Sequence, residues 1–173
     1  MEEQVVLVDH LDNPLGIIDK MEAHSLGLLH RAFSVFIFNS NGELLLQQRA
    51  LDKYHSGGKW TNTCCSHPKP FEETAEAAAR RLMEEMGMVC ELEYGFNFVY
   101  ESTLENGLTE HEFDHVFFGI SDELPIINRD EVASFRYVNL EELALDLNEN
   151  PNQYTSWLKI CFDNIVAFKS KAS

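Results

Sequence analysis

Residues 72–88 of the chain read EETAEAAARRLMEEMGM. Pro70 and Thr74 mark the start of a helix, the alanines favour helical backbone, and Gly87 stands where a helix would stop. Successive helical residues lie about 100° apart, so one face should form a buried stripe. The expected members of that stripe are Ala75, Ala78, Ala79, Leu82 and Met86.

The polar side of this helix carries two arginines and three glutamates. Glu84 falls opposite the stripe and should face solvent. Arg81 and Glu85, four residues apart, should lie together on the flank of the stripe. They form either a solvated ion pair or a polar pair presented to a pocket beside the core.

The stretch just upstream, residues 60–68, reads WTNTCCSHP and holds two thiols and an imidazole. In a strand from Trp60 to Cys65, alternate side chains share a face. Cys65 and His67 should then point one way, about 7 Å apart by Cα, and Cys64 the other way. The alternative is a buried strand with two small apolar cysteines.

The helix resembles the signature of the Nudix superfamily, which has a Glu, then an Arg after seven intervening residues, and a terminal Glu-Glu-x-Gly-hydrophobic run. Here these are Glu72, Arg80 and residues 84–88. Two positions depart from the pattern. Ser66 stands where the superfamily has its first Gly, and Arg81 stands where it has a Glu that helps to bind the metals of hydrolysis. Exchanging a carboxylate for a cation should weaken a hydrolytic multi-magnesium site.

A Nudix signature with these two departures, placed just after a Thr-Asn-Thr-Cys-Cys-Ser-His-Pro run, resembles the type I isopentenyl-diphosphate isomerases. The resemblance extends from about Asp19 to the helix that carries Trp157. It implies an α+β protein, built as a Nudix-type α/β/α sandwich around a mixed β-sheet. The length suits a single domain over residues 1–173.

The rest of the chain reads as strands with helices inserted late, an α+β order. A turn of Asn39 to Gly42 should join two strands, and Asn139 with Glu142 should start a helix that runs through Leu147. A last helix should begin near Thr155 or Ser156. The expected strands are 5–8, 33–38, 43–48, 60–65, 96–101, 108–120 and 135–138.

The net charge of −16 argues against nucleic acid or an anionic membrane as a partner. An anionic diphosphate would need metal ions and local cations to reverse the sign of the charge in its pocket.

Residues 1–4 lack the cationic flank of a signal peptide, and no apolar run approaches membrane-spanning length. The four cysteines have neither the paired spacing of a zinc knuckle nor that of the disulfide framework of a secreted protein. We therefore expect a monomer or weak dimer in a reducing cytoplasm.

Residues 109–118 form a second chemical cluster, TEHEFDHVFF. In a strand, Glu110, Glu112 and Asp114 share one face, and His111 and His115 the other. The carboxylates indicate either an exposed edge or a pair that grips a metal, with one member poised for proton transfer. The isomerase match falls on Glu110 and Glu112, so Asp114 and the two histidines are interpreted as structural.

A third cluster holds His24 and His30, six residues apart around a glycine. Taken alone, each is an ordinary surface histidine. The resemblance implies that they bind metal together with His67, Glu110 and Glu112. Nitrogen and oxygen ligands suit one Zn²⁺ or Mn²⁺ per chain better than magnesium alone. His55 has no matching role, and residues 54–58 depart from the aromatic-Pro-Gly pattern that is frequent in the family.

The resemblance also implies the reaction, which converts isopentenyl to dimethylallyl diphosphate through a tertiary carbocation. Two acid–base groups must face each other across a narrow pocket. They would be Cys65 as the base and Glu112 on the protonating side, with Tyr100 assisting. Which of the two delivers the first proton stays open at this point. Trp157 matches an aromatic residue that stabilises the cation, or it anchors the last helix in the core.

The diphosphate needs cations of its own. Glu85 matches the last Nudix carboxylate and would hold Mg²⁺ against the phosphate oxygens. The resemblance implies four basic substrate-binding residues, Lys20, Arg49, Lys53 and Arg81. The competing interpretations are a Nudix pyrophosphohydrolase acting on a nucleoside diphosphate derivative and a non-catalytic protein with a structural metal.

Overall fold

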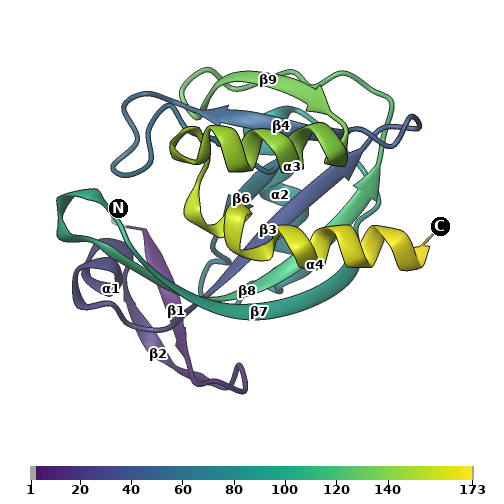
Figure 1. Ribbon diagram of the computed structural model, residues 1–173. Coiled ribbons are helices and arrows are strands. Elements are labelled where there is room, and N and C mark those ends of the chain that lie inside the picture. Colours follow the sequence, from purple (N-terminus) through teal and green to yellow (C-terminus); the bar gives the residue numbers. More distant parts are fainter. Residues whose placement is uncertain (1–2, 173) are drawn as a thin grey trace.

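The computed structural model describes residues 3–172 (Figure 1). The expectation about a signal peptide rests partly on Met1 and Glu2, which lie outside the described residues. Within the described range, no helix has the length and apolar character needed to cross a membrane.

One mixed sheet of nine strands forms the middle of the molecule. β3 is its hub, because it pairs antiparallel with β1, β4 and β6 and parallel with β8. β2 extends the sheet beyond β1, β7 lies beside β8, and β5 and β9 lie beside β4. The strands are β1 (Gln4–Val8), β2 (Pro14–Asp19), β3 (His30–Phe38), β4 (Leu44–Arg49), β5 (Trp60–Thr61), β6 (Cys64–Ser66), β7 (Glu93–Thr103), β8 (Thr109–Ile120) and β9 (Val132–Val138).

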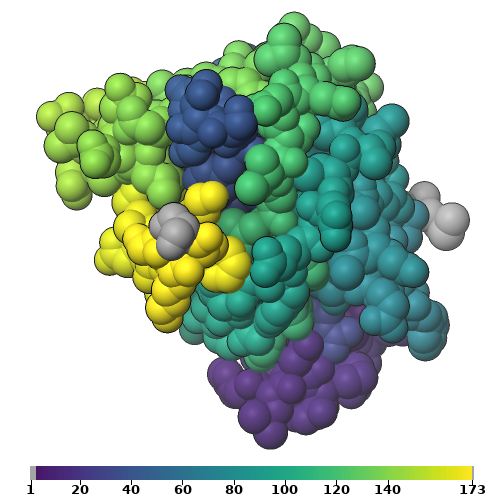
Figure 2. Space-filling view, turned by 90° about the vertical axis from the view of Figure 1, so that its right-hand side faces the viewer, coloured from purple at the N-terminus to yellow at the C-terminus, as the bar shows by residue number. Residues whose placement is uncertain are grey.

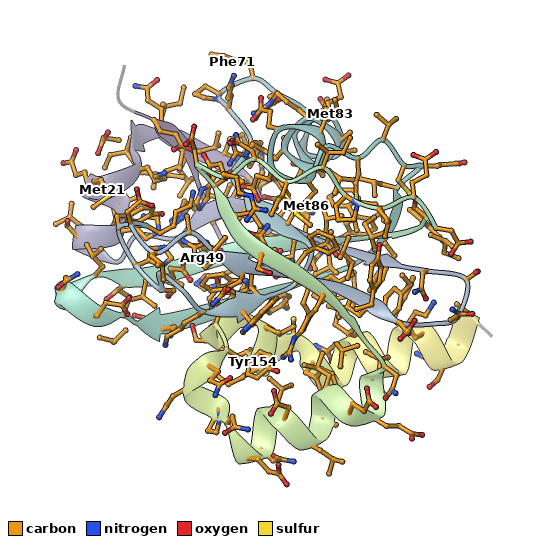
Figure 3. The ribbon with its side chains drawn as sticks, turned by 90° about the horizontal axis from the view of Figure 1, so that it is seen from above. Met21, Arg49, Phe71, Met83, Met86 and Tyr154 are labelled. Carbon is orange, nitrogen blue, oxygen red and sulfur yellow. The ribbon has the colours of Figure 1, made fainter. Side chains whose placement is uncertain are left out.

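Helices cover both faces of the sheet, as seen from above in Figure 3. One apolar cluster joins the sheet to α2, and another joins it to the C-terminal helices. The expected α/β/α sandwich around a mixed sheet is therefore confirmed. The helices are α1 (Lys20–Leu26), α2 (Thr74–Met86), α3 (Leu140–Glu149) and α4 (Ser156–Ala172), with short 3₁₀ turns η1 (Glu105–Gly107) and η2 (Pro151–Gln153).

The expected single strand from Trp60 to Cys65 is wrong. β5 pairs with β4 and β6 pairs with β3, with a break at Asn62 and Thr63 between them. There the side chains take over backbone hydrogen bonding. The Asn62 amide donates to the Val35 and Cys64 carbonyls, and Thr63 Oγ1 donates to the Leu45 carbonyl. The chain thereby crosses from one strand pair to another.

Helix α2 begins at Thr74, and Gly87 caps its end with the expected left-handed backbone (φ 62°). The predicted stripe is partly wrong, since Ala75 and Ala79 are exposed and Ala77 is buried. The buried face is turned toward Ala77, which brings Glu85 inward. Its carboxylate then accepts from the Gln47 amide on β4, at 2.9 Å.

Strand β2 and helix α1 are missing from the sequence-based expectation. Asp19 caps α1 by accepting from the backbone N–H groups of Met21 and Glu22. Gly27 ends the helix in the left-handed region, with φ 65°. This short helix carries Lys20 and His24 into the site. In Figure 2 the N-terminal segment, in purple, lies at the lower end of the molecule.

The other elements agree with expectation within a few residues. Asn39 and Gly42 close the turn before β4 through a backbone hydrogen bond of 3.0 Å. Asn139 caps α3 by accepting from the Glu142 N–H. Helix α4 begins at Ser156, as expected, and buries Trp157, Leu158, Cys161, Phe162 and Ile165.

Candidate active site and metal centre

Sheet register brings three polar side chains into one row. His30 on β3 lies opposite Glu112 on β8, and Glu112 lies opposite Tyr100 on β7. Directly opposed residues face the same side of a sheet. All three are buried, which excludes the alternative of an exposed carboxylate edge at Glu112. The Tyr100 hydroxyl lies 2.7 Å from Glu112 Oε2 and 2.9 Å from Glu110 Oε2.

Backbone contacts give the rings of His24 and His30 an orientation and tautomer suited to metal binding. The Nδ1–H of His24 donates to the Lys20 carbonyl at 2.7 Å, and that of His30 donates to the Leu28 carbonyl at 2.8 Å. A carbonyl can only accept, so each neutral ring keeps its lone pair on Nε2. Among the described residues, the buried Nε2 of His24 has no hydrogen-bond partner.

Four donors, from His24, His30, His67 and Glu112, converge within 4.8 Å of one another. The Nε2 atoms of His30 and His67 are 3.2 Å apart, and Glu112 Oε1 is 3.0 Å from His67 Nε2 and 3.5 Å from His30 Nε2. Adjacent ligands of an ion bound at about 2.1 Å lie about 3 Å apart. With the unpartnered nitrogen of His24, this donor set fits a divalent transition metal.

The charges in this group are strongly linked. Burial lowers the pKa of His24 and of His67. Burial also opposes the charge on His30, but Glu112 outweighs it and raises the pKa of His30. Burial disfavours an ionised Glu112 as well, yet hydrogen bonds to His30 and His67 hold the pKa of Glu112 well below its usual range. Glu112 is therefore a carboxylate in the resting site.

Glu110 falls in a second group of three donors, which shares His24 with the first and includes His55. Glu110 Oε1 lies 4.0 Å from His24 Nε2 and 3.1 Å from His55 Nε2. The five expected ligands thus lie in two adjoining sets. Sequence reasoning missed His55, and the departure of residues 54–58 from the family pattern was the available signal.

The two neighbouring cysteines face opposite sides of the sheet. Cys64 pairs with Val35 and packs in the α2 cluster, as expected. Cys65 pairs with Ser34 and lines a cavity with Glu112 and Trp157. Burial raises the pKa of the Cys65 thiol, so this group is protonated at neutral pH.

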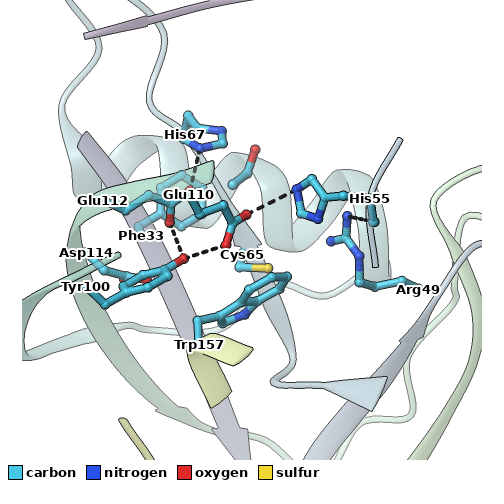
Figure 4. Close-up of a pocket in the computed structure, with 11 residues that line it drawn as sticks. Phe33, Arg49, His55, Cys65, His67, Tyr100, Glu110, Glu112, Asp114 and Trp157 are labelled. Carbon is cyan, nitrogen blue, oxygen red and sulfur yellow. Dashed lines mark hydrogen bonds and ion pairs between the residues drawn. The ribbon is translucent and has the colours of Figure 1, made fainter. Parts of the chain in front are cut away.

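Figure 4 shows the cavity, here called the inner cavity. Its volume is about 40 Å³, the space of roughly three water molecules. Trp157 closes one side, with its indole N–H donating to Asn62 at 3.1 Å. Both expected roles of Trp157 are compatible with this position. The lining residues are Phe33, Arg49, His55, Cys65, Ser66, His67, Tyr100, Glu110, Glu112, Asp114 and Trp157.

Asp114, interpreted as structural from sequence, also lines the inner cavity. One oxygen accepts from the Ser34 hydroxyl at 2.8 Å, and the other has no partner among the described residues. Burial, reinforced by the charge of Glu112, raises the pKa of Asp114 well above its ordinary value. Burial and the neighbouring charge therefore favour the neutral acid form of Asp114.

A second hollow of about 300 Å³, here called the outer pocket, adjoins the inner cavity. The two share Arg49, Cys65, Ser66 and His67. The outer pocket gathers basic side chains on an otherwise acidic protein, including all four expected substrate-binding residues. The cations lining it are Lys20, Arg49, Lys53, Lys69, Arg80 and Arg81, against Glu3, Glu84, Glu85 and Glu131.

Carboxylates hold several of these cations in place. Lys20 pairs with Glu3, and Lys53 pairs with Glu131. Arg81 donates to Glu85 at 2.5 Å, which confirms that this pair faces a pocket. Arg49 is the buried member of this group and forms no ion pair among the described residues. The Nε atoms of Arg49 and Arg81 both lack a hydrogen-bond partner there, so the residues that line this pocket include two unsatisfied donors.

Comparisons with known proteins agree with this arrangement. A family model described as "NUDIX domain" matches residues 28–158. "Isopentenyl-diphosphate Delta-isomerase 2" of Aromatoleum aromaticum is 54% identical over 98% of this chain and 90% of its own length. "Isopentenyl-diphosphate Delta-isomerase" of Pectobacterium atrosepticum is 53% identical over 98% of this chain and 97% of its own length.

Solved structures support the fold. The crystal structure of DR0079 from Deinococcus radiodurans superposes with a TM-score of 0.79 at 19% identity, covering 94% of this chain and 98% of that one. A MutT protein from Methanosarcina mazei Go1 gives a TM-score of 0.67 at 20% identity, covering 84% and 96%. The chain therefore belongs to the Nudix family and, within it, to the isopentenyl-diphosphate Δ-isomerases.

Proposed function

We propose that this enzyme converts isopentenyl diphosphate to dimethylallyl diphosphate at the junction of the inner cavity and the outer pocket. One observation carries the proposal. A small buried cavity holding the Cys65 thiol, Glu112 and Tyr100 opens into a larger pocket rich in cations. The five-carbon chain occupies the first and the diphosphate the second. A volume of about 40 Å³ is closer to a short hydrocarbon chain than to a nucleobase.

The directions of the pKa shifts at Cys65 and Glu112 support an order for the proton transfers. Cys65 is a thiol and Glu112 a carboxylate, because burial raises the pKa of the first and the two histidines lower that of the second. The Cys65 S–H bond breaks as its proton adds to the terminal alkene carbon, which leaves a tertiary cation at C3. Glu112 removes a proton from C2, and those electrons form the C2–C3 double bond. The net reaction changes no oxidation state.

This order reverses the roles that the family resemblance implied for the two groups. Each turnover leaves a thiolate and a carboxylic acid, which exchange protons with solvent before the next cycle. The reverse reaction starts from that second state. General acid–base catalysis of this kind is typically worth about 10²–10⁴-fold.

The cation forms in a cavity that excludes water and offers it a π face. Trp157 is the proposed stabilising ring. The raised pKa of Tyr100, caused by burial and by Glu110 and Glu112, keeps its hydroxyl protonated. Tyr100 therefore keeps its proton, which it donates to one of the two neighbouring carboxylates at a time.

A divalent transition metal fits the group of His24, His30, His67 and Glu112. When bound, it supplies positive charge that holds Glu112 ionised and in place. Imidazole nitrogens with a carboxylate favour Zn²⁺ or Mn²⁺. Glu110, whose Oε1 lies 4.0 Å from His24 Nε2, is the proposed fifth ligand.

The diphosphate is bound by Lys20, Arg49, Lys53 and Arg81, and Mg²⁺ held by Glu85 shares its charge. The unsatisfied Nε of buried Arg49 supports this assignment. Arg81 replaces the carboxylate that a hydrolytic Nudix site would use. It grips a diphosphate that must leave intact, so the site favours isomerisation over pyrophosphate hydrolysis.

The proposal is tested by incubating the enzyme with isopentenyl diphosphate in deuterated water. We expect dimethylallyl diphosphate that carries deuterium, with no phosphate released. Phosphate release from nucleoside diphosphate derivatives, without isomerisation, would identify a pyrophosphohydrolase. A fold that needs the metal but turns over neither substrate would identify a structural metal protein.

We also propose that the chain works as a monomer or weak dimer in a reducing cytoplasm, without nucleic acid or membrane as a partner. Support comes from the net charge of −16 and from Cys65, whose proposed role requires a reduced thiol. Light scattering at micromolar concentration would test the oligomeric state.

A further inference from the structure

His55 is a buried histidine outside the ligand set that the family resemblance implies. Its Nε2 lies 3.1 Å from Glu110 Oε1, and its ring lines the inner cavity, as Figure 4 shows. Burying an imidazole costs hydration free energy unless hydrogen bonds replace the lost water contacts. The contact with Glu110 is therefore a candidate for a specific role.

The loop of residues 54–58 is built to hold this ring inward. Ser56 adopts a left-handed backbone (φ 53°) that a side-chain-bearing residue rarely adopts. Its N–H donates to the Glu105 carboxylate. A Cβ on Gly57 would lie 2.5 Å from the Leu51 carbonyl oxygen, so only glycine permits this close approach. The loop therefore fixes the direction of His55.

The hydrogen bond at Nδ1 separates His55 from the proposed ligands. His24 and His30 face carbonyls, which force the proton onto Nδ1 and leave Nε2 bare. His55 faces the Ser56 hydroxyl at 3.1 Å, and a hydroxyl can donate. With Ser56 donating to Nδ1, the ring carries its proton on Nε2 and donates it to Glu110.

His55 also connects the two hollows. Its backbone carbonyl accepts from Arg49 Nη2 at 3.2 Å, and its ring meets Trp157 edge-on with centroids 6.0 Å apart. One residue thus touches a proposed metal ligand, a proposed diphosphate ligand and the proposed cation-stabilising ring.

We propose that His55 is a positioning residue that holds Glu110 for metal binding through its Nε2–H. The Tyr100 hydroxyl lies 2.9 Å from Glu110 Oε2, and His55 Nε2 lies 3.1 Å from Oε1, so groups on both sides hold the carboxylate beside His24. The inference rests on the proposed metal centre. Loss of such an outer hydrogen bond typically weakens metal binding by about 10–100-fold.

The test compares His55→Ala with His55→Gln in the full chain. Glutamine offers an N–H at roughly the reach of imidazole Nε2 but is a poor ligand for a transition metal. Zn²⁺ affinity, measured by competition with a chelating dye, should fall about 10–100-fold in His55→Ala and recover largely in His55→Gln. The visible spectrum of bound Co²⁺ should be the same in His55→Gln and the wild type.

Each other outcome has a defined meaning. If the Co²⁺ spectrum of His55→Gln changes, His55 is itself a ligand and the positioning role is overturned. Unchanged Zn²⁺ affinity in His55→Ala overturns it too, provided that His24→Ala loses the metal. If His24→Ala keeps the metal, the proposed metal centre itself fails. The exposed His10→Ala is the matched control, and circular dichroism checks that each variant is folded.

Discussion

At the scale of single residues, the function depends on which way adjacent side chains point. Cys64 and Cys65 have the same chemistry, yet one packs against α2 and the other lines the inner cavity. Strand alternation predicted this difference from sequence. The environment of Asp114 and of His55 was not predictable in the same way, since their burial comes from segments distant in sequence.

The cysteine pair gives a matched test. Cys65→Ala should reduce turnover by at least about 10²-fold, because it removes the proposed proton donor, while circular dichroism stays normal. Cys64→Ala should keep most activity and cost roughly 1 kcal/mol of stability, as for a small core deletion. Initial rates and urea unfolding measure both effects. A folded, active Cys65→Ala enzyme would refute the assignment.

The two glutamates separate proton transfer from metal binding. Glu112→Gln should abolish isomerisation even in metal-loaded enzyme, because an amide cannot accept the C2 proton. Glu110→Gln should weaken metal binding and regain activity partly in excess metal. Turnover and metal content are measured side by side. Near-normal turnover of metal-loaded Glu112→Gln would move the acid–base role to another residue.

Asp114 should leave a signature in the pH dependence of stability. Its pKa is raised well above 3.8, first by burial, so above about pH 4 the folded state keeps a proton that the unfolded chain loses. The contribution of this carboxyl to stability therefore falls as pH rises. Asp114→Asn does not titrate, and it should gain stability relative to wild type between pH 4 and 8 in metal-free urea unfolding.

Asp122 provides the control of opposite sign. A backbone hydrogen bond from Ser40 lowers the pKa of Asp122, so its stabilising effect is present above the unfolded pKa and is lost as pH falls. Asp122→Asn should lose stability at neutral pH, and the loss should shrink on acidification. A stability difference for Asp114→Asn that does not change with pH would contradict the assignment.

At the scale of elements, strong local signals were predictable and context-dependent ones were not. The alanine-rich composition and Gly87 defined α2 correctly at both ends. The rotation of α2 was not predictable, because Gln47 on a distant strand draws Glu85 inward. β2 and α1 are short, and their contacts with β1 and the N-terminal segment hold them in place.

Helix α2 presents Arg81 to the outer pocket, where it should bind diphosphate. Arg81→Ala should raise KM about 10-fold or more, as expected for a lost charge-assisted hydrogen bond, with a smaller effect on kcat. Lys171→Ala removes one exposed positive charge from α4 and serves as the control. If KM changes by a similar factor in both variants, the change in net charge explains the effect and a specific contact of Arg81 with diphosphate is ruled out.

At the scale of the whole molecule, the apolar core that holds the fold together is distinct from the proposed metal ligands. The two main apolar clusters lie on either side of the sheet and include none of the proposed ligands. Chelation should therefore lower the thermal midpoint while the chain stays folded at 25 °C. Bound metal at 1,000 times its Kd contributes about 4.1 kcal/mol.

Differential scanning calorimetry with and without chelator measures this effect. One transition is expected in each case, since we propose that residues 1–173 form a single domain. Activity should vanish on chelation and return with Zn²⁺ or Mn²⁺. Loss of far-ultraviolet circular dichroism on chelation would instead indicate a structural metal.

The row of Tyr100, Glu112 and His30 across β7, β8 and β3 has a consequence for folding. A slip of one residue between β3 and β8 would turn the side chains of one strand, with His30 or Glu112 among them, to the opposite face. Only the native pairing of these two strands then offers the complete donor set to an ion. Metal present during refolding should selectively stabilise correctly aligned chains by mass action. The proposed metal would thus favour the native strand register before it takes part in catalysis.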